Sequence, residues 1–193
     1  MFYNGPDRVL APELEEFLAA GPPPVVFTLG TSAVGAAGRF YHESAAAAER
    51  LGVRAVLLTG AFEQNRPDSE LSRHVLLVHR APHQLLFPRA SAIVLHGGIG
   101  TTGQALRSGR PMLVVPHGHD QFDNAHRVTK LGVARTLHPK RYRAPRVAAE
   151  LARLLNDDYR ARAESVAALV RGEGGAIAAA EAIERLTVEA TLD

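Results

Sequence analysis

The sequence predicts an α/β fold with a doubly wound, parallel, Rossmann-like sheet of about six strands. Short apolar runs alternate along the chain with segments of helical character, which is the pattern of parallel-sheet proteins. Most of these runs are apolar at consecutive positions, so each strand should be buried on both faces. A chain of 193 residues, 46% of them hydrophobic, suits one such domain, and two domains would be cramped.

The elements follow one another in a regular order. The expected strands are residues 25–29, 54–59, 75–78, 92–95, 112–115 and 134–137. The expected helices are residues 12–20, 39–51, 101–108, 121–131 and 145–190, the last broken near residues 172–175. Gly52, Gly109 and Gly132 each stand where a helix should stop, because glycine readily adopts the left-handed C-terminal conformation. Three prolines at 22–24 separate a lead-in segment, residues 1–24, from the main unit, residues 25–193.

Composition narrows the class of protein. The formal net charge is only +2 and the arginines are scattered, which argues against a nucleic-acid partner. Without cysteine there is neither a disulfide framework nor thiolate chemistry. The sequence shows no apolar signal core and no run of the ~18 apolar residues that a membrane span needs. We therefore expect no transmembrane segment and a cytoplasmic location, with peripheral membrane association left open.

The most informative stretch is residues 91–102. An apolar run stops at His96, passes Gly97, Gly98 and Gly100, and enters a helical segment. Glycines let a ligand approach the backbone closely, and a helix start offers free N–H groups and a positive dipole end. Polar and histidine residues also follow the other strands, and the carboxyl ends of parallel strands are where ligands bind in such sheets. This edge is predicted to bind a phosphorylated ligand.

A dinucleotide site is a competing interpretation of the same residues. Gly98, Gly100 and Gly103 fit the pattern G-x-G-x-x-G, and Asp120 lies 20 residues beyond Gly100. However, the motif follows the fourth strand instead of the first, and Asp120 lies beyond a proline, away from where it would meet a ribose. His96 would also crowd the pyrophosphate. We therefore do not favour a dehydrogenase.

A metal site is a second competing interpretation. His117, His119, Asp120 and His126 lie close in sequence, but they lack a convincing third-ligand spacing, so no metal is expected.

A longer set of motifs resembles the donor-binding half of the UDP-glycosyltransferases, above all the bacterial natural-product, rhamnosyl and sterol glycosyltransferases. The similar segments are residues 25–32, 80–86, 96–106, 109–111, 116, 120–125 and 131–134. The resemblance implies the C-terminal half of a GT-B fold, in which two Rossmann-like domains face a cleft. Residues 1–24 would then be a lead-in helix and interdomain linker, and residues 25–193 the donor-binding domain with its C-terminal helices.

The resemblance also implies roles for individual residues. The donor diphosphate would be bound by Thr31, Ser32, His96, Gly98, Gly100, Thr101 and Thr102. The nucleoside would be bound by Arg80, Ala81 and Gln104, and the donor sugar by Asp120 and Gln121. No Asp-x-Asp metal motif occurs, so fixed dipoles would stabilise the departing diphosphate. The implied function is metal-independent, inverting hexosyl transfer from a UDP- or dTDP-sugar, without a cofactor, to a small-molecule or lipid acceptor.

Two positions depart from the pattern of the plant relatives. Arg80 stands in place of a tryptophan and Gln104 in place of a ribose-binding glutamate, which leaves the choice between uridine and thymidine open.

In this family the general base is a histidine of the other domain, which also forms the acceptor pocket. Only about two dozen residues precede the first strand, so the isolated chain should bind donor and transfer poorly. The expected partner is an acceptor-binding N-terminal domain or a separate subunit of a split enzyme. A non-catalytic nucleotide-binding module and, more weakly, an epimerase of the related class are alternatives.

Purely structural roles are alternatives for four of the site residues. His96 could cap neighbouring backbone, Asp120 could cap the helix from residue 121 as well as bind sugar, and Thr31 or Ser32 could cap the next helix.

Overall fold

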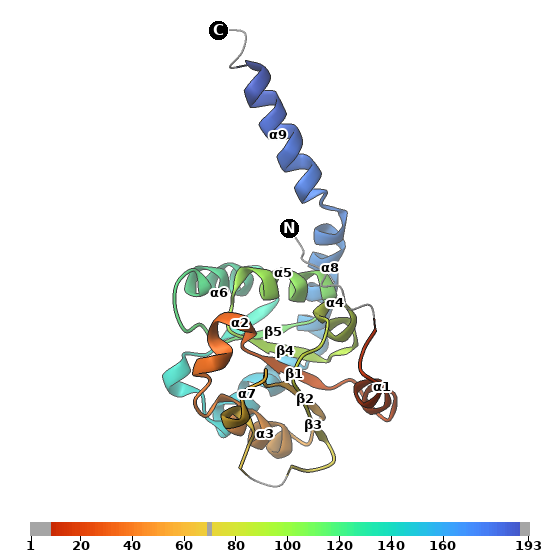
Figure 1. Ribbon diagram of the computed structural model, residues 1–193, viewed down its shortest axis with the longest axis vertical. Coiled ribbons are helices and arrows are strands. Elements are labelled where there is room, and N and C mark those ends of the chain that lie inside the picture. The colour runs from red at the N-terminus through yellow and green to blue at the C-terminus, as the bar shows by residue number, and fades with distance from the viewer. Residues whose placement is uncertain (1–8, 69–70, 190–193) are drawn as a thin grey trace.

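The computed structural model describes residues 9–68 and 71–189 and shows one sheet between two layers of helices (Figure 1). The six strands are all parallel, in the order β3-β2-β1-β4-β5-β6. They are β1 (Val25–Thr28), β2 (Ala55–Leu58), β3 (Val75–Val78), β4 (Ala92–Leu95), β5 (Met112–Val114) and β6 (Ala134–Thr136). The predicted fold class and all six strands are therefore confirmed.

The strand order reverses between β1 and β4. β1 pairs on one side with β2, where Val26 lies opposite Val56, and on the other side with β4, where Val26 lies opposite Ile93. The connections from β1 and from β4 therefore leave the same sheet edge in opposite directions. Ligands bind parallel sheets at such a point, and the glycine segment directly follows β4 there.

The helices divide between the two faces of the sheet. The principal helices are α1 (Pro12–Ala19), α3 (Phe40–Leu51), α5 (Ile99–Ser108), α6 (Gln121–Lys130), α7 (Ala144–Leu154), α8 (Asp157–Gly172) and α9 (Gly175–Glu189). Helical turns α2 (Gly30–Ala33) and α4 (His83–Leu86) lie in the loops after β1 and β3. Helices α3 and α7 pack on one face, and α1, α5, α6 and α8 on the other.

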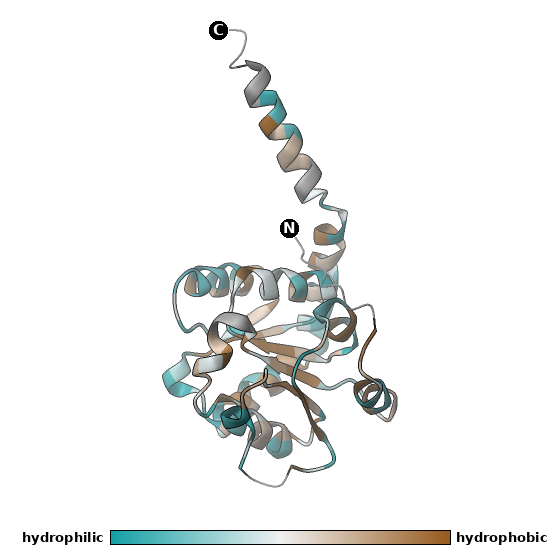
Figure 2. Ribbon diagram, in the orientation of Figure 1, coloured by the Kyte–Doolittle hydropathy of each residue, from teal (hydrophilic) through white to brown (hydrophobic). Residues whose placement is uncertain are grey.

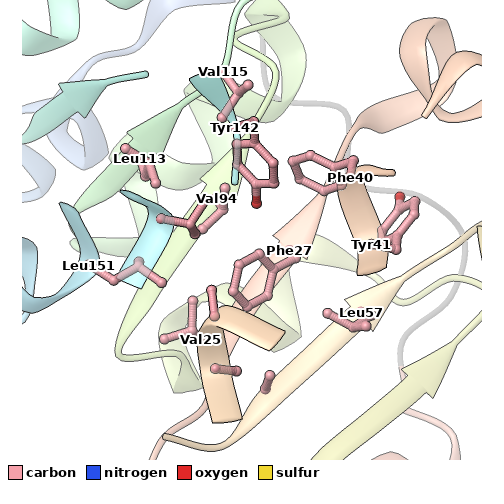
Figure 3. Close-up of a cluster of buried hydrophobic side chains, with 14 of the residues drawn as sticks. Val25, Phe27, Phe40, Tyr41, Leu57, Val94, Leu113, Val115, Tyr142 and Leu151 are labelled. Carbon is pink, nitrogen blue, oxygen red and sulfur yellow. The ribbon is translucent and has the colours of Figure 1, made fainter. Parts of the chain in front are cut away.

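Alternate strand residues supply two hydrophobic cores. Phe27, Val94 and Leu113 join residues of α3 and α7 in the first core (Figure 3). Val26 and Ile93 join residues of the opposite helical layer in the second. Figure 2 shows the central strands as the most hydrophobic part of the fold, which explains why they are apolar at consecutive positions.

Two helix boundaries differ from the prediction. Helix α5 begins at Ile99, two residues before the predicted start at 101. The predicted C-terminal helix breaks not only near 172–175 but also at residues 155–156. There the Asn156 side chain accepts a hydrogen bond from the Tyr159 amide (3.1 Å) and so caps a new helix, α8.

The two terminal helices behave differently. Helix α1 packs on the domain through buried Leu14 and Leu18, and the Arg54 guanidinium lies 4.0 Å over the Phe17 ring. Helix α9 instead extends away from the body of the fold (Figure 1), and all its described side chains are exposed. Within the described ranges, no helix is both long and apolar enough to cross a bilayer.

The first core should dominate stability. Phe27 is fully buried at its centre, so Phe27→Ala should lower the free energy of unfolding by about 3–5 kcal/mol, because it removes a large apolar side chain and leaves a cavity. Urea denaturation would measure this loss. Leu169→Ala, at a side chain that is 72% exposed, is the control and should change the unfolding midpoint little; equal losses in both variants would contradict this account of the core.

Candidate nucleotide-binding site

The start of α5 presents unpaired backbone amides at the sheet edge. Gly98 is the N-cap residue, with φ −63° and ψ 140°, and the first bond inside the helix runs from the Thr102 amide to the Gly98 carbonyl (2.9 Å). The amides of Ile99, Gly100 and Thr101 precede that bond and have no acceptor within the helix. They form the positive end of the helix dipole, where an anion is stabilised.

The backbone amide of Thr102 is not free to bind phosphate, although Thr102 was expected to contact the diphosphate from the helix start. Its amide is used by Gly98, because the helix begins two residues earlier than predicted. The side chain is only 3% exposed, and its hydroxyl oxygen is buried without a hydrogen-bond partner among the described residues. Thr102 therefore packs into the domain, behind the helix start.

His96 is held between two glycines. A Cβ atom built on Gly30 would lie 2.5 Å from His96 Cε1, and one built on Gly98 would lie 2.3 Å from His96 Nε2. Gly30 also has φ +63°, which glycine adopts most readily. Glycine is thus required at both positions because the imidazole fills the space that a side chain would need.

His96 is neutral at physiological pH. Its side chain is 3% exposed, and Nδ1 is buried without a hydrogen-bond partner in the described part of the chain. Burial and the nearby His117 lower its pKa to about 4, although the Asp120 charge acts in the opposite direction. The residue can offer a hydrogen bond to a ligand without carrying a charge of its own.

Gly100 is a glycine for a different reason. A Cβ atom there would meet no atom of the described part of the chain within 4 Å, so packing among these residues does not require the absence of a side chain. Gly97, in contrast, has φ +91°, and a Cβ atom would lie 2.9 Å from Val114 Cγ1. Open space in front of Gly100 is what close approach of a ligand to the helix start requires.

Asp120 and Gln121 lie at the start of α6, and their side chains make different hydrogen bonds. Asp120 occupies the N-cap position of α6, as expected, but its side chain makes no capping bond. Its Oδ2 instead accepts from Asn124 Nδ2 (2.8 Å), which also donates to the Gly97 carbonyl (2.9 Å). Gln121 is 5% exposed, and its Oε1 accepts from the amides of His117 (2.7 Å) and Gly118 (3.2 Å). Asp120 is exposed at the edge, whereas Gln121 holds the loop before it.

The predicted nucleoside residues line two neighbouring cavities. Arg80 and Ala81 border a cavity of about 270 Å³ beyond the ends of β1 and β2, and Gln104 borders one of about 280 Å³ between α4 and α5. His83 lines both cavities. The structure thus does not gather Arg80, Ala81 and Gln104 in one cavity; their two cavities share His83 as a lining residue.

Two residues were missed by the sequence interpretation. His83 stacks on Phe87 with ring centroids 4.3 Å apart, and burial and the neighbouring His96 lower its pKa to about 4. Its place two residues after Ala81 was the available signal. The link from Asn124 to Gly97 crosses 27 positions of sequence, so no local pattern signals it.

Two further expectations concern the phosphate contacts of Thr31 and Ser32 and the metal site. Thr31 and Ser32 belong to α2, which follows β1 at the same edge, but their side chains lie outside the described part of the structure. Among the residues searched, which are the described ones, no group of three or more histidine or acidic side chains could hold a metal ion.

Comparison with known proteins identifies the class of fold. The structure of the glycosyltransferase VinC in complex with DTDP matches with a TM-score of 0.71 at 28% identity, covering 89% of this chain and 42% of that one. The chain therefore has the fold of one half of a GT-B glycosyltransferase.

The family follows from the sequence. Residues 52–183 match the family described as erythromycin biosynthesis protein CIII-like, C-terminal domain, and the chain belongs to this family.

Two curated relatives illustrate the family. The vancomycin aglycone glucosyltransferase of Amycolatopsis orientalis is 36% identical over 173 residues, which is 90% of this chain and 42% of that protein. The O-mycaminosyltylonolide 6-deoxyallosyltransferase of Streptomyces fradiae is 35% identical over 188 residues, which is 97% of this chain and 42% of that protein. The chain thus spans less than half the length of these relatives and corresponds to their C-terminal half.

The neutral state of His96 predicts that acid destabilises the fold. The unfolded chain takes up a proton near the ordinary pKa of 6.5, whereas folded His96 does so only near pH 4. Stability should therefore fall as pH drops from 7 to 4, by on the order of 3 kcal/mol for this residue, since one pKa unit corresponds to about 1.4 kcal/mol. Urea unfolding at several pH values would measure the slope.

A matched pair of variants isolates this effect. His96→Gln should make the pH dependence between 7 and 4 less steep, because glutamine does not titrate; part of the slope remains, since the pKa of His83 is also lowered to about 4. His126→Gln, at an exposed position of α6, should keep the parental slope. If His96→Gln kept that slope too, His96 would not be the group responsible.

Proposed function

We propose that this chain is the donor-binding domain of a metal-independent, inverting hexosyltransferase that uses a UDP- or dTDP-sugar. One observation carries the proposal. Unpaired backbone amides at the start of α5 lie close to a neutral histidine, and the space in front of them is open at Gly100, a glycine that packing does not require. The relatives named as glycosyltransferases support the activity, and the DTDP in the VinC structure supports the class of ligand.

The diphosphate lies against the start of α5 in this proposal. The amides of Gly98, Gly100 and Thr101 donate to its oxygens, and His96 adds a hydrogen bond from its Nε2 side, next to Gly98. Fixed dipoles of this kind stabilise the negative charge that develops on the leaving group and replace a metal ion. Thr31 and Ser32, in the facing turn α2, contact the outer phosphate.

The nucleoside and the sugar extend in two directions from the diphosphate. Arg80, Ala81 and Gln104 border the two cavities that meet at His83, and the nucleoside occupies this region. The exposed carboxylate of Asp120 accepts hydrogen bonds from sugar hydroxyls. Gln121 contributes through its amide nitrogen, because its oxygen is already used by the loop.

Transfer further requires an acceptor-binding half. We propose that the general base and the acceptor pocket lie in an N-terminal domain or in a partner subunit, since the relatives are more than twice as long as their match to this chain. Residues 1–24 serve as the connection and residues 25–193 as the donor-binding domain. We place the reaction in the cytoplasm, as the sequence leads us to expect.

Calorimetry with UDP, dTDP and their glucose derivatives in EDTA tests the proposal. Saturable binding of a nucleoside diphosphate without a divalent cation is expected, and NAD should not compete. Absence of binding by both diphosphates would exclude the donor-binding role. Purification with and without a candidate N-terminal half would show whether transfer needs it.

Gly100→Ala should weaken diphosphate binding by about tenfold, because the methyl group keeps phosphate oxygens away from charge-assisted amide contacts. The variant should fold as well as the parent, since the methyl meets no atom of the residues that the structure describes and alanine favours a helix. Gly172→Ala, also without nearby atoms, is the control. Isothermal titration with UDP and dTDP measures both; unchanged affinity in Gly100→Ala would place the phosphates elsewhere.

Asp120→Asn should separate sugar from nucleotide recognition. Affinity for the nucleotide sugar is expected to fall about tenfold, because charge-assisted hydrogen bonds to hydroxyls are lost, while affinity for the matching diphosphate changes much less, through the link of Asn124 to Gly97 alone. Competition titrations of UDP-glucose against UDP provide the comparison. Equal losses for both ligands would assign Asp120 to the diphosphate or to loop structure.

A further inference from the structure

A third cavity lies at the same sheet edge, beyond β5, and the proposed donor site does not use its side chains. Its volume is about 130 Å³, which suits a small group and is too small for a nucleotide. It is lined by Ala37, Arg39, Phe40, Val115, His117, Pro139, Tyr142 and Arg143. The cavity is close to the proposed sugar residues, because the His117 amide donates to Gln121 Oε1 (2.7 Å).

Two arginines give this cavity a positive charge, and no lining residue is acidic. Arg39 has a nearby carboxylate, Glu43, at 3.4 Å, and that carboxylate also accepts from the Ala144 amide (2.7 Å). Arg143 donates to the Tyr142 carbonyl (2.9 Å) and forms no ion pair within residues 9–68 and 71–189. One guanidinium charge therefore remains uncompensated at the cavity.

His117 adds a hydrogen-bond acceptor of fixed position. Its Nδ1 lies 2.8 Å from the Val115 carbonyl oxygen, which can only accept, so Nδ1 carries the proton. Burial lowers its pKa, although the bond to Val115 acts in the opposite direction. The neutral ring then presents Nε2 as an acceptor.

Aromatic rings complete the wall. Phe40 and Tyr142 stack with centroids 4.7 Å apart and an interplanar angle of 19°, and both are 4% exposed. Their packing fixes the helix start that carries Arg39 and the segment that carries Arg143. Arg39 and Arg143 are therefore each next in sequence to one of the two stacked rings.

We propose that this cavity binds a hydroxy carboxylate, with the carboxylate on Arg39 and Arg143 and the hydroxyl donating to His117 Nε2. Such a group is present in a hexuronic acid on the donor and in a hydroxy acid that serves as acceptor. The chemistry of recognition is the same in both cases. The inference rests on the proposed function only for the source of the group.

Two pairs of probes distinguish the sources. UDP-glucuronate against UDP-glucose tests a donor sugar, and salicylate against 2-hydroxybenzyl alcohol tests a free acid, each pair differing in the carboxylate. Calorimetry for the nucleotides and NMR shifts for the small acids would be run on the parent chain, Arg143→Gln and Arg146→Gln. Arg146 is exposed on α7 outside the cavity and is the matched control.

At least one acid should bind better than its neutral counterpart, and Arg143→Gln should reduce that preference about fivefold to tenfold, because a charged hydrogen bond is lost. Arg146→Gln should keep the preference. Equal binding within both pairs, or a preference untouched by Arg143→Gln, would overturn the inference. Benzoate binding as tightly as salicylate would remove the role of His117.

The result for the carboxylate cavity can be distinguished from the result for the proposed donor site. UDP binding to all three proteins should be the same, because Arg143 is outside the proposed diphosphate site. Failure of UDP to bind the parent chain would refute the proposed function, and the salicylate pair would still decide whether the cavity takes a carboxylate. Thermal melts of Arg143→Gln and Arg146→Gln would check that each variant still folds.

Discussion

The close contact of His96 with Gly30 and Gly98 is the constraint on which the site depends. It joins the loop after β1 to the loop after β4, the two neighbouring strands at which the sheet order reverses. The imidazole fills the space between the two loops, and its burial keeps it uncharged. Next to His96, the positive potential therefore comes from the backbone amides at the start of α5 and not from the imidazole.

Much of the fold could be predicted from sequence because burial leaves a simple pattern. Strands β1, β2 and β4 are covered on both faces, so their residues are consecutively apolar, and Gly52 and Gly109 adopt the left-handed conformation that ends α3 and α5. The spacing of Gly97, Gly98 and Gly100 likewise points to the candidate site. The resemblance to glycosyltransferases rested on these same short-range signals.

The remaining details depend on contacts between distant segments. The start of α5 at Ile99 changes the role of Thr102, and a shift of two residues is beyond what local preference resolves. His83 gains its place between two cavities from the packing of α4 against α5. The cavity beside β5 combines Arg39 with Arg143, which are about a hundred positions apart in sequence. The packing of α3 against α7 brings them together, including the stacked rings of Phe40 and Tyr142 and the bond from the Ala144 amide to Glu43.

The two hydrogen bonds that Asn124 donates have a consequence for the free energy of ligand binding. Its single amide group holds both the carbonyl of Gly97 and the carboxylate of Asp120, so the two halves of a nucleotide sugar would be recognised by parts that share a donor. The amide group has two hydrogens and donates to both acceptors at once, so a ligand that moved Asp120 would also act on the side chain that holds the glycine bend. The binding energies of the hexose and of the phosphates should then fail to add independently, and a double-mutant cycle across these positions would show coupling.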